Sequence, residues 1–261
     1  MKKFPIILPA LLLLFFQTFA QTSSNDVSRP KLVVGIVVDQ MRWDYLYRFY
    51  SRYENGGFKR LLNEGFSCEN TYINYVPTVT AIGHASVYTG SVPAIHGITG
   101  NDFIIQKTGK SMYCTGDSTV TTLGSNSTAG KMSPRNLMAS TITDELKLAT
   151  NFRSKVIGVS VKDRGGILPA GHAANAAFWF DDASGNMISS TYYMKDLPNW
   201  VKEFNKRGLA AKFLNEKWNT LYPLNSYLQS SADNNPYEGS YKKQKSPVFP
   251  HDLPALKGGN F

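Results

Sequence analysis

The chain has 261 residues and a formal net charge of +9; 42% of its residues are apolar and 18% are charged. Such a composition excludes a disordered protein and allows one sizeable hydrophobic core with an appended region. The basic residues are dispersed except around residues 242–245. The positive balance suits an anionic substrate or a polyanionic surface, and because the basic residues are dispersed we expect no nucleic-acid binding.

The N-terminal segment has the features of a secretory signal. Two lysines precede an apolar run that ends at Phe16. Small residues lie before the expected cleavage site, which follows Ala20. We expect residues 1–20 to be a signal peptide and the mature protein to be periplasmic or secreted. Because the run contains Pro9 and is shorter than the roughly 20 residues of a membrane span, we expect no stable membrane anchor.

The next segments predict the first strand and helix of a sheet protein. Residues 31–38 hold a continuous β-branched run, which is typical of a parallel strand buried on both faces. Asp39 follows, so we expect its carboxylate at the carboxyl edge of a sheet, where α/β proteins bind ligands. Residues 57–65 indicate a helix that ends at a glycine, and residues 66–75 alternate as a strand.

Residues 76–84 predict the start of a short helix of small residues that ends at Gly90. Thr80 would lie at its N-terminus, where unpaired N–H groups and a partial positive charge favour an anion and stabilise an alkoxide. Two structural interpretations compete with this one. Thr80 could cap its own helix, and Asp39 could merely cap the helix that follows it.

Later segments continue the alternation of strands and helices. Residues 107–131 are polar and predict a hairpin or surface loop, and Ser133 and Pro134 predict the start of a helix with apolar residues at helical spacing up to Ala149. Residues 155–161 predict another buried strand. The fold class is therefore α/β, with a doubly wound and mainly parallel sheet.

The pattern changes after residue 164. Residues 177–193 predict an antiparallel hairpin, two helices are indicated over 200–207 and 211–218, and the rest is polar. We divide the chain into a signal peptide, an N-terminal part of an α/β core and a small α+β cap or accessory region; their bounds are 1–20, 21–164 and 165–261. Cys68 and Cys114 could form one disulfide, or Cys68 could be a small buried hydrophobic residue.

Five short motifs occur in order, and together they are far more specific than any one of them. They are Val38–Gln40, Pro77–His84, Gly90–Gly97, Gly100–Asp102 and Val161–Arg164. These motifs resemble those of the PafA-type alkaline phosphatases, which use a threonine nucleophile and belong to the alkaline phosphatase superfamily with the nucleotide pyrophosphatase/phosphodiesterases. The resemblance extends from about Pro30 to the end of the chain.

The resemblance implies hydrolysis of small phosphate monoesters through a covalent phosphothreonine on Thr80. It implies a site for two Zn²⁺ ions with Asp39 and Thr80 among the ligands, and a metal would lower the pKa of the threonine hydroxyl. Asn101, Lys162 and Arg164 would be catalytic and substrate-binding residues. Asn101 would donate a hydrogen bond to a phosphoryl oxygen, and the two cations would bind the phosphoryl group, as in monoesterases.

The family's other metal ligands lie in Asp-x-x-x-His and Asp-His motifs and a distal histidine. This sequence contains none of these pairs, so we expect the remaining ligands beyond Phe261 and interpret the chain as the N-terminal half of an enzyme, acting as a monomer. Two ligands would not hold a catalytic zinc, because three protein ligands are typical.

Alternatives stay open for residues and for function. Thr78 is the rival nucleophile, although the motif places the reactive hydroxyl second; Asn101 could hold a turn, and Lys162 and Arg164 could be solvated charges. The histidines at positions 84, 96 and 172 we interpret as structural. A phosphodiesterase or nucleotide pyrophosphatase and a non-catalytic exported binding protein or fragment are the alternative functions. A sulfatase would need a Cys- or Ser-derived nucleophile in a Cys/Ser-x-Pro-x-Arg motif, and neither Cys68 nor Cys114 begins such a motif.

Overall fold

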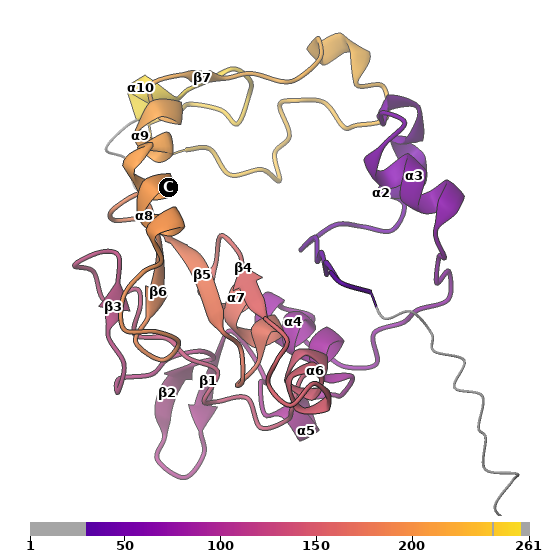
Figure 1. Ribbon diagram of the computed structural model, residues 1–261. Coiled ribbons are helices and arrows are strands. Elements are labelled where there is room, and N and C mark those ends of the chain that lie inside the picture. The colour runs from indigo at the N-terminus through magenta and orange to yellow at the C-terminus, as the bar shows by residue number, and fades with distance from the viewer. Residues whose placement is uncertain (1–29, 242, 257–261) are drawn as a thin grey trace, which may run out of the picture. The chain divides into compact units, whose positions relative to one another are not determined.

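The computed structural model describes residues 30–241 and 243–256, and the chain divides into two units, Met1–Val38 and Asp39–Phe261 (Figure 1). The expected signal peptide lies outside the described residues. None of the helices that the described residues form has the length and apolarity needed to cross a membrane.

The described part of the first unit, residues 30–38, contains no strand, so the buried strand predicted over 31–38 is wrong. Leu32 and Ile36 are each 78% exposed. A strand is stable only when neighbouring backbone pairs with its N–H and C=O groups, and the described residues of this unit include no second strand.

The second unit contains a four-stranded sheet in the order β3-β6-β5-β4 (Figure 1). Its central strand β5 (Ala176–Asp181) is an apolar run that is buried at every position except Phe180. The other strands are β3 (Thr122–Leu123), β4 (Ile157–Val159) and β6 (Asn186–Ser190). Gly185 turns the chain between β5 and β6 at a φ of 71°, a conformation that favours glycine, and the predicted hairpin is confirmed.

The sheet is mixed rather than mainly parallel. β4 pairs parallel with β5, whereas β5–β6 and β3–β6 are antiparallel. Helix α7 (Asp163–Ala170) lies in the connection between β4 and β5, and such a crossover is what a parallel pair requires. The connection 182–185 between β5 and β6 is too short for a crossover, so this pair must be antiparallel.

Helix α7 packs between the sheet and helix α4 (Thr80–Thr89). Leu168 joins a buried cluster with Ala81 and Ala85 of α4, while Ile167 belongs to a second cluster with Trp179 of β5. The start of α4 at Thr80 and its end before Gly90, which has a left-handed φ of 62°, are as predicted. Through these contacts α4 and α7 pack directly against each other.

The helix predicted from Ser133 begins later than expected. Helix α6 (Ile142–Ala149) is capped by Thr141, whose hydroxyl accepts from the Asp144 N–H at 3.1 Å while Asp144 Oδ2 accepts from the Thr141 N–H at 3.0 Å. Ser133 instead donates its hydroxyl to Asp117 Oδ2 at 2.6 Å. Its oxygen also accepts from the Arg135 N–H at 3.3 Å, but only a turn follows and no helix begins there.

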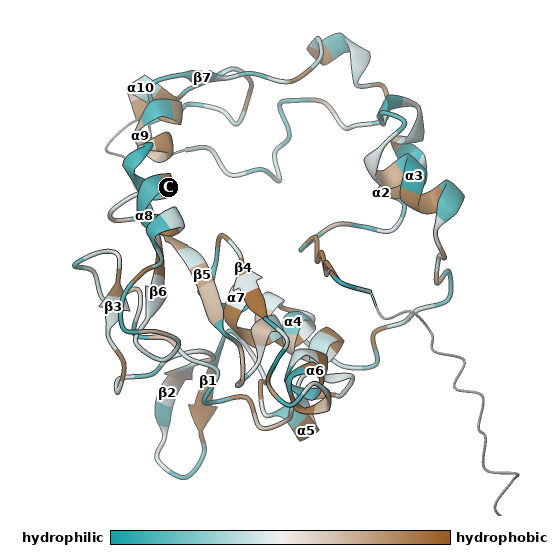
Figure 2. Ribbon diagram, in the orientation of Figure 1, coloured by the Kyte–Doolittle hydropathy of each residue, from teal (hydrophilic) through white to brown (hydrophobic). Residues whose placement is uncertain are grey.

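The remaining elements are short. Helix α3 (Gly57–Glu64) ends at Gly65 as predicted, and its hydrophilic and hydrophobic residues form alternating bands in Figure 2. Residues 66–75 form no strand, and the helix predicted over 211–218 is shorter. The other elements are α2 (Tyr45–Arg48), η1 (Tyr50–Arg52), α5 (Pro93–His96), β1 (Asp102–Ile105), β2 (Lys110–Tyr113), α8 (Asn199–Lys206), α9 (Leu209–Phe213), β7 (Lys217–Trp218), η2 (Leu224–Ser226), β8 (His251–Asp252) and α10 (Leu253–Leu256).

The proposed boundary between core and cap, residues 164 and 165, falls within α7, and β5 beyond it pairs with β4 before it. Cys68 and Cys114 are both free thiols, so they form no disulfide. Cys114 is buried, whereas Cys68 is exposed and is not the buried hydrophobic residue considered above. The polar segment 107–131 contributes the end of a β1–β2 hairpin and strand β3.

Candidate active site

Thr80 and Asp39 lie side by side at the start of α4. The Thr80 hydroxyl donates a hydrogen bond to Asp39 Oδ2 at 3.0 Å. The N-cap of α4 is Val79, in an extended conformation, and this residue makes no side-chain capping hydrogen bond. The Thr80 oxygen therefore does not serve its own helix, and the capping alternative for Thr80 is wrong.

Asn101 takes one of the unpaired N–H groups of the same helix. Its Oδ1 accepts from the Ala81 N–H at 3.0 Å. This bond uses the side-chain oxygen and leaves the two N–H donors of the Asn101 amide for other partners. Gly100 precedes it, and a Cβ there would lie 2.5 Å from the Asp102 carbonyl oxygen, so the close turn requires glycine.

Lys162 and Arg164 flank the start of α7. Lys162 is exposed and its Nζ lies 3.6 Å from Asp182 Oδ2, whereas Arg164 is half-buried and donates from Nη1 to the Tyr113 hydroxyl at 2.8 Å. Among the described residues, no hydrogen bond joins either cation to Thr80, Asp39 or Asn101. The structure thus joins Thr80 to Asp39 and Asn101 to the first turn of the same helix, and it places the two cations at the start of the adjacent helix.

The histidines are hydrogen-bonded within the fold, as their structural interpretation predicts. His84 Nδ1 lies 2.9 Å from the Thr80 carbonyl oxygen, one helical turn back. His96 is fully buried; it accepts from the Ile98 N–H at Nδ1 and lies 2.9 Å from the Ser86 hydroxyl at Nε2, and burial lowers its pKa. His172 contacts Asp144 and the Leu137 carbonyl. Each of the three therefore has a structural role.

Sequence reasoning missed the partners of Arg164. Tyr113 ends strand β2 and donates its hydroxyl to Asp163 Oδ1 at 2.9 Å, and the Thr115 hydroxyl donates to Asp163 Oδ2. The one available signal was an acidic residue between two basic ones, Lys162-Asp163-Arg164. Nothing in the sequence connects that segment to Tyr113, about fifty positions earlier.

Asp39 and Thr80 supply two oxygen atoms of the kind that Zn²⁺ binds, but a zinc site typically has at least three protein ligands. Within the described ranges, no group of three or more His, Cys, Asp or Glu side chains could hold a metal ion. These residues by themselves therefore do not fit a complete zinc site.

A profile of the type I phosphodiesterase / nucleotide pyrophosphatase family matches residues 33–246. The chain belongs to this family. A protein of Myroides odoratus named a calcium-transporting ATPase is 62% identical over 245 residues, which are 94% of this chain and 45% of that protein. Alkaline phosphatase PhoV of Synechococcus elongatus is 61% identical over 227 residues, 87% of this chain and 41% of PhoV.

Alkaline phosphatase PafA of Elizabethkingia meningoseptica is 58% identical over 241 residues, 90% of this chain and 44% of PafA. The crystal structure of wild-type PafA matches with a TM-score of 0.84 at 59% identity, and the match covers 88% of this chain and 44% of that chain. The resemblance to PafA-type alkaline phosphatases and the α/β fold class are thereby confirmed. The chain spans less than half the length of these relatives.

A second PafA crystal structure carries substitutions of one threonine, one asparagine, one lysine and one arginine, and it matches with the same TM-score at 58% identity. The sequence analysis selected the same four residue types in this chain: Thr80 as the nucleophile, and Asn101, Lys162 and Arg164 as catalytic and substrate-binding residues.

Proposed function

We propose that the whole protein is an alkaline phosphatase that hydrolyses phosphate monoesters through a phosphothreonine on Thr80. The observation that carries this proposal is the position of the Thr80 hydroxyl. It lies at the N-terminus of α4, 3.0 Å from Asp39 Oδ2, where the N-cap residue makes no side-chain hydrogen bond and Asn101 Oδ1 accepts from the neighbouring Ala81 N–H. A nucleophilic oxygen in that position meets the partial positive charge that favours a phosphoryl anion.

In the first step, the Thr80 oxygen bonds to phosphorus, the bond from phosphorus to the ester oxygen breaks, the hydroxyl gives up its proton and the alcohol leaves protonated. Water then attacks the phosphothreonine, which frees the Thr80 hydroxyl and inorganic phosphate. Asn101 would donate from its free amide to a phosphoryl oxygen. Lys162 and Arg164 would bind the phosphoryl group, and their double charge would favour a dianionic monoester over a diester.

We propose zinc binding only for the whole protein and not for this chain by itself. Asp39 and Thr80 would be two of the ligands of a two-zinc site whose other ligands lie outside this chain, and bound zinc would supply a lowered pKa for the hydroxyl. We also propose export by the signal peptide, which N-terminal sequencing of the secreted protein tests: an N-terminus that retains Lys2 and Lys3 contradicts it.

The family description, type I phosphodiesterase / nucleotide pyrophosphatase, supports a second candidate reaction on the same site. Lys162 and Arg164 favour the monoesterase, because a diester carries one negative charge less. ATP ends in a phosphoryl dianion, so it belongs among the test substrates together with a monoester and a diester.

The decisive test asks which threonine becomes phosphorylated. The full-length enzyme, quenched in acid during turnover of a monoester, should carry phosphate on Thr80 when analysed by mass spectrometry. Thr80→Ala should abolish the label, and Thr80→Ser should keep much of the activity because serine offers the same oxygen.

Thr78→Ala is the matched control, since Thr78 has the same side chain two positions away and is exposed. It should keep the phosphate label and lose at most about 1 kcal/mol of stability. Phosphate found on Thr78, or a labelled Thr80→Ala variant, would overturn the assignment.

A further inference from the structure

The guanidinium of Arg164 is held in place by one neighbour. Its Nη1 donates to the Tyr113 hydroxyl at 2.8 Å, and this is the one hydrogen-bond partner that Arg164 has among the described residues. The Nε atom of Arg164 is buried and unpartnered within the same described part of the chain. An arginine side chain has several rotatable bonds, so its orientation here depends on Tyr113.

The direction of each hydrogen bond follows from the chemistry of the groups. Arginine only donates, so the Tyr113 oxygen accepts from Arg164. The Tyr113 O–H then donates to Asp163 Oδ1 at 2.9 Å, and the other oxygen of Asp163 accepts from Thr115. Burial and the Asp163 charge raise the pKa of Tyr113 well above its ordinary value, which keeps the phenol protonated as this arrangement requires.

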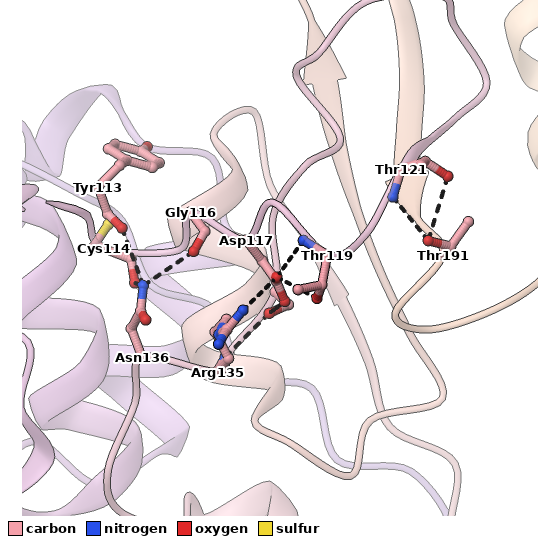
Figure 3. A network of polar contacts seen from close by, with 10 residues as sticks. Tyr113, Cys114, Gly116, Asp117, Thr119, Thr121, Arg135, Asn136 and Thr191 are labelled. Atoms are coloured by element: carbon pink, nitrogen blue, oxygen red, sulfur yellow. Dashed lines mark hydrogen bonds and ion pairs between the residues drawn. The ribbon is translucent and has the colours of Figure 1, made fainter.

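Residues 133–136 form hydrogen bonds with the segment that carries Tyr113. The Asn136 amide nitrogen lies 3.2 to 3.3 Å from the carbonyl oxygens of Tyr113, Cys114 and Gly116, and Figure 3 shows it pointing at this segment. The buried Asp117 carboxylate next in the chain accepts from Arg135 Nη1 at 2.9 Å (Figure 3). The backbone of the segment that carries Tyr113 is therefore held by several hydrogen bonds from residues 133–136.

The same segment reaches Asn101. The Cys114 N–H donates to the Asn101 carbonyl oxygen at 2.8 Å. Residues 113–115 thus contact the backbone of one proposed phosphoryl-binding residue and the side chain of another, although Asn101 and Arg164 belong to separate elements. One short segment fixes the relative position of both.

We propose that Tyr113, supported by Asp163 and Thr115, is a positioning residue that aims the Arg164 guanidinium at the phosphoryl group. This inference rests on the proposed phosphatase function, which assigns Arg164 to the substrate. A guanidinium held through one Nη presents its other donors in a fixed fork, which matches two phosphoryl oxygens. A misaimed arginine would lose most of that contact in the transition state.

The test is a double-mutant cycle in the full-length enzyme. Tyr113→Phe removes the hydroxyl and keeps the ring, and we expect kcat/KM for a monoester to fall by about tenfold, the loss typical of one hydrogen bond to a charged group. The loss for a diester should be smaller. In an Arg164→Ala background, Tyr113→Phe should change kcat/KM little, because the residue that it positions is gone.

Tyr193→Phe is the matched control. The Tyr193 hydroxyl is also buried, but it has no hydrogen-bond partner in the described residues, so its removal should leave both activities unchanged. The proposal would be overturned if Tyr113→Phe lowered kcat/KM by the same factor in the Arg164→Ala background as in the wild type. Tyr113 would then act on the fold rather than through Arg164.

A measurement on the full-length protein that does not depend on catalysis separates this inference from the proposed function. The Nε–H of Arg164 is buried, so its exchange with solvent, observed by ¹⁵N NMR of the arginine side chains, should be slow and should accelerate in Tyr113→Phe but not in Tyr193→Phe. Unchanged exchange overturns the positioning role even if the enzyme is active. A full-length protein without monoesterase activity overturns the proposed function, whatever the exchange rates.

Discussion

At the scale of single residues, His172 and Asp144 form a pair that the mechanism does not use, and it is an ion pair when His172 is protonated. His172 Nδ1 lies 3.2 Å from Asp144 Oδ2, and its Nε2 lies 3.0 Å from the Leu137 carbonyl oxygen. Both nitrogens face acceptors, so the doubly protonated ring fits this position. The Asp144 hydrogen bond raises the pKa of His172 against the opposing effect of burial. Burial favours a higher pKa for Asp144, but its hydrogen bonds outweigh burial and lower it.

The raised pKa of His172 predicts a stability that decreases with pH. Its contribution is complete below the unfolded-state pKa of about 6.5 and is lost as the pH rises through the higher pKa of the folded state. Urea unfolding of the chain between pH 6 and 9 should show this decrease, and His172→Gln should remove it. An equal pH dependence in the variant would show that another group is responsible.

At the scale of elements, the contact between β4 and α7 depends on a glycine. A Cβ at Gly158 would overlap the carbonyl oxygen of Gly166 and would lie 3.0 Å from the Ala170 Cβ. Since the first of these atoms is helix backbone, it cannot move without shifting α7. The close approach of strand and helix therefore fixes where α7, and with it Arg164, lies against the sheet.

Gly158→Ala should lower the free energy of unfolding by about 1–3 kcal/mol, the usual cost of forcing an extra group into a packed interior. Denaturant unfolding of the chain measures this loss. Gly83→Ala is the control: Gly83 lies inside α4 with no atom within 4 Å of a new Cβ, so alanine should raise stability by up to about 1 kcal/mol through helix propensity. Equal effects at both positions would contradict the packing argument.

The same scale shows what the sequence could predict. The start of α4, its end at Gly90 and the β5–β6 hairpin were predictable, because local turn and capping chemistry determines them. The orientation of α6 was not. Its apolar Ile142 is 69% exposed, whereas Lys147 is buried and its ammonium lies 2.9 Å from the Ser154 carbonyl and 3.2 Å from Asn175 Oδ1.

For the candidate site, motifs selected Asp39, Thr80 and Asn101; Thr80 bonds Asp39, and Asn101 bonds the backbone of Ala81, the residue after Thr80. The strand expected to deliver Asp39 is absent, because a strand's existence depends on partners that its own sequence does not contain. Tyr113 escaped prediction for the same reason: a tyrosine hydroxyl has a role only once the fold brings Asp163 and Arg164 to it.

At the scale of the whole molecule, the chain spans less than half the length of its relatives. Its described residues bring few metal-binding side chains together. Asp39 and Thr80 offer one carboxylate and one hydroxyl, 3.0 Å apart, and the described residues include no cluster of three or more metal-binding side chains. Catalytic zinc sites typically have three protein ligands and structural sites have four, so one carboxylate and one hydroxyl should hold the ion only weakly.

This chain, dialysed against zinc and then against buffer, should therefore retain well below one zinc per chain when measured by inductively coupled plasma mass spectrometry. Asp39→Ala should remove whatever remains, because it deletes the one carboxylate beside Thr80 in the described structure. Glu64→Ala is the control, since this exposed carboxylate pairs with Arg60 away from the site and its loss should not change the zinc content. Stoichiometric zinc in both the wild type and Asp39→Ala would place the metal elsewhere in the chain and would contradict the assignment of Asp39.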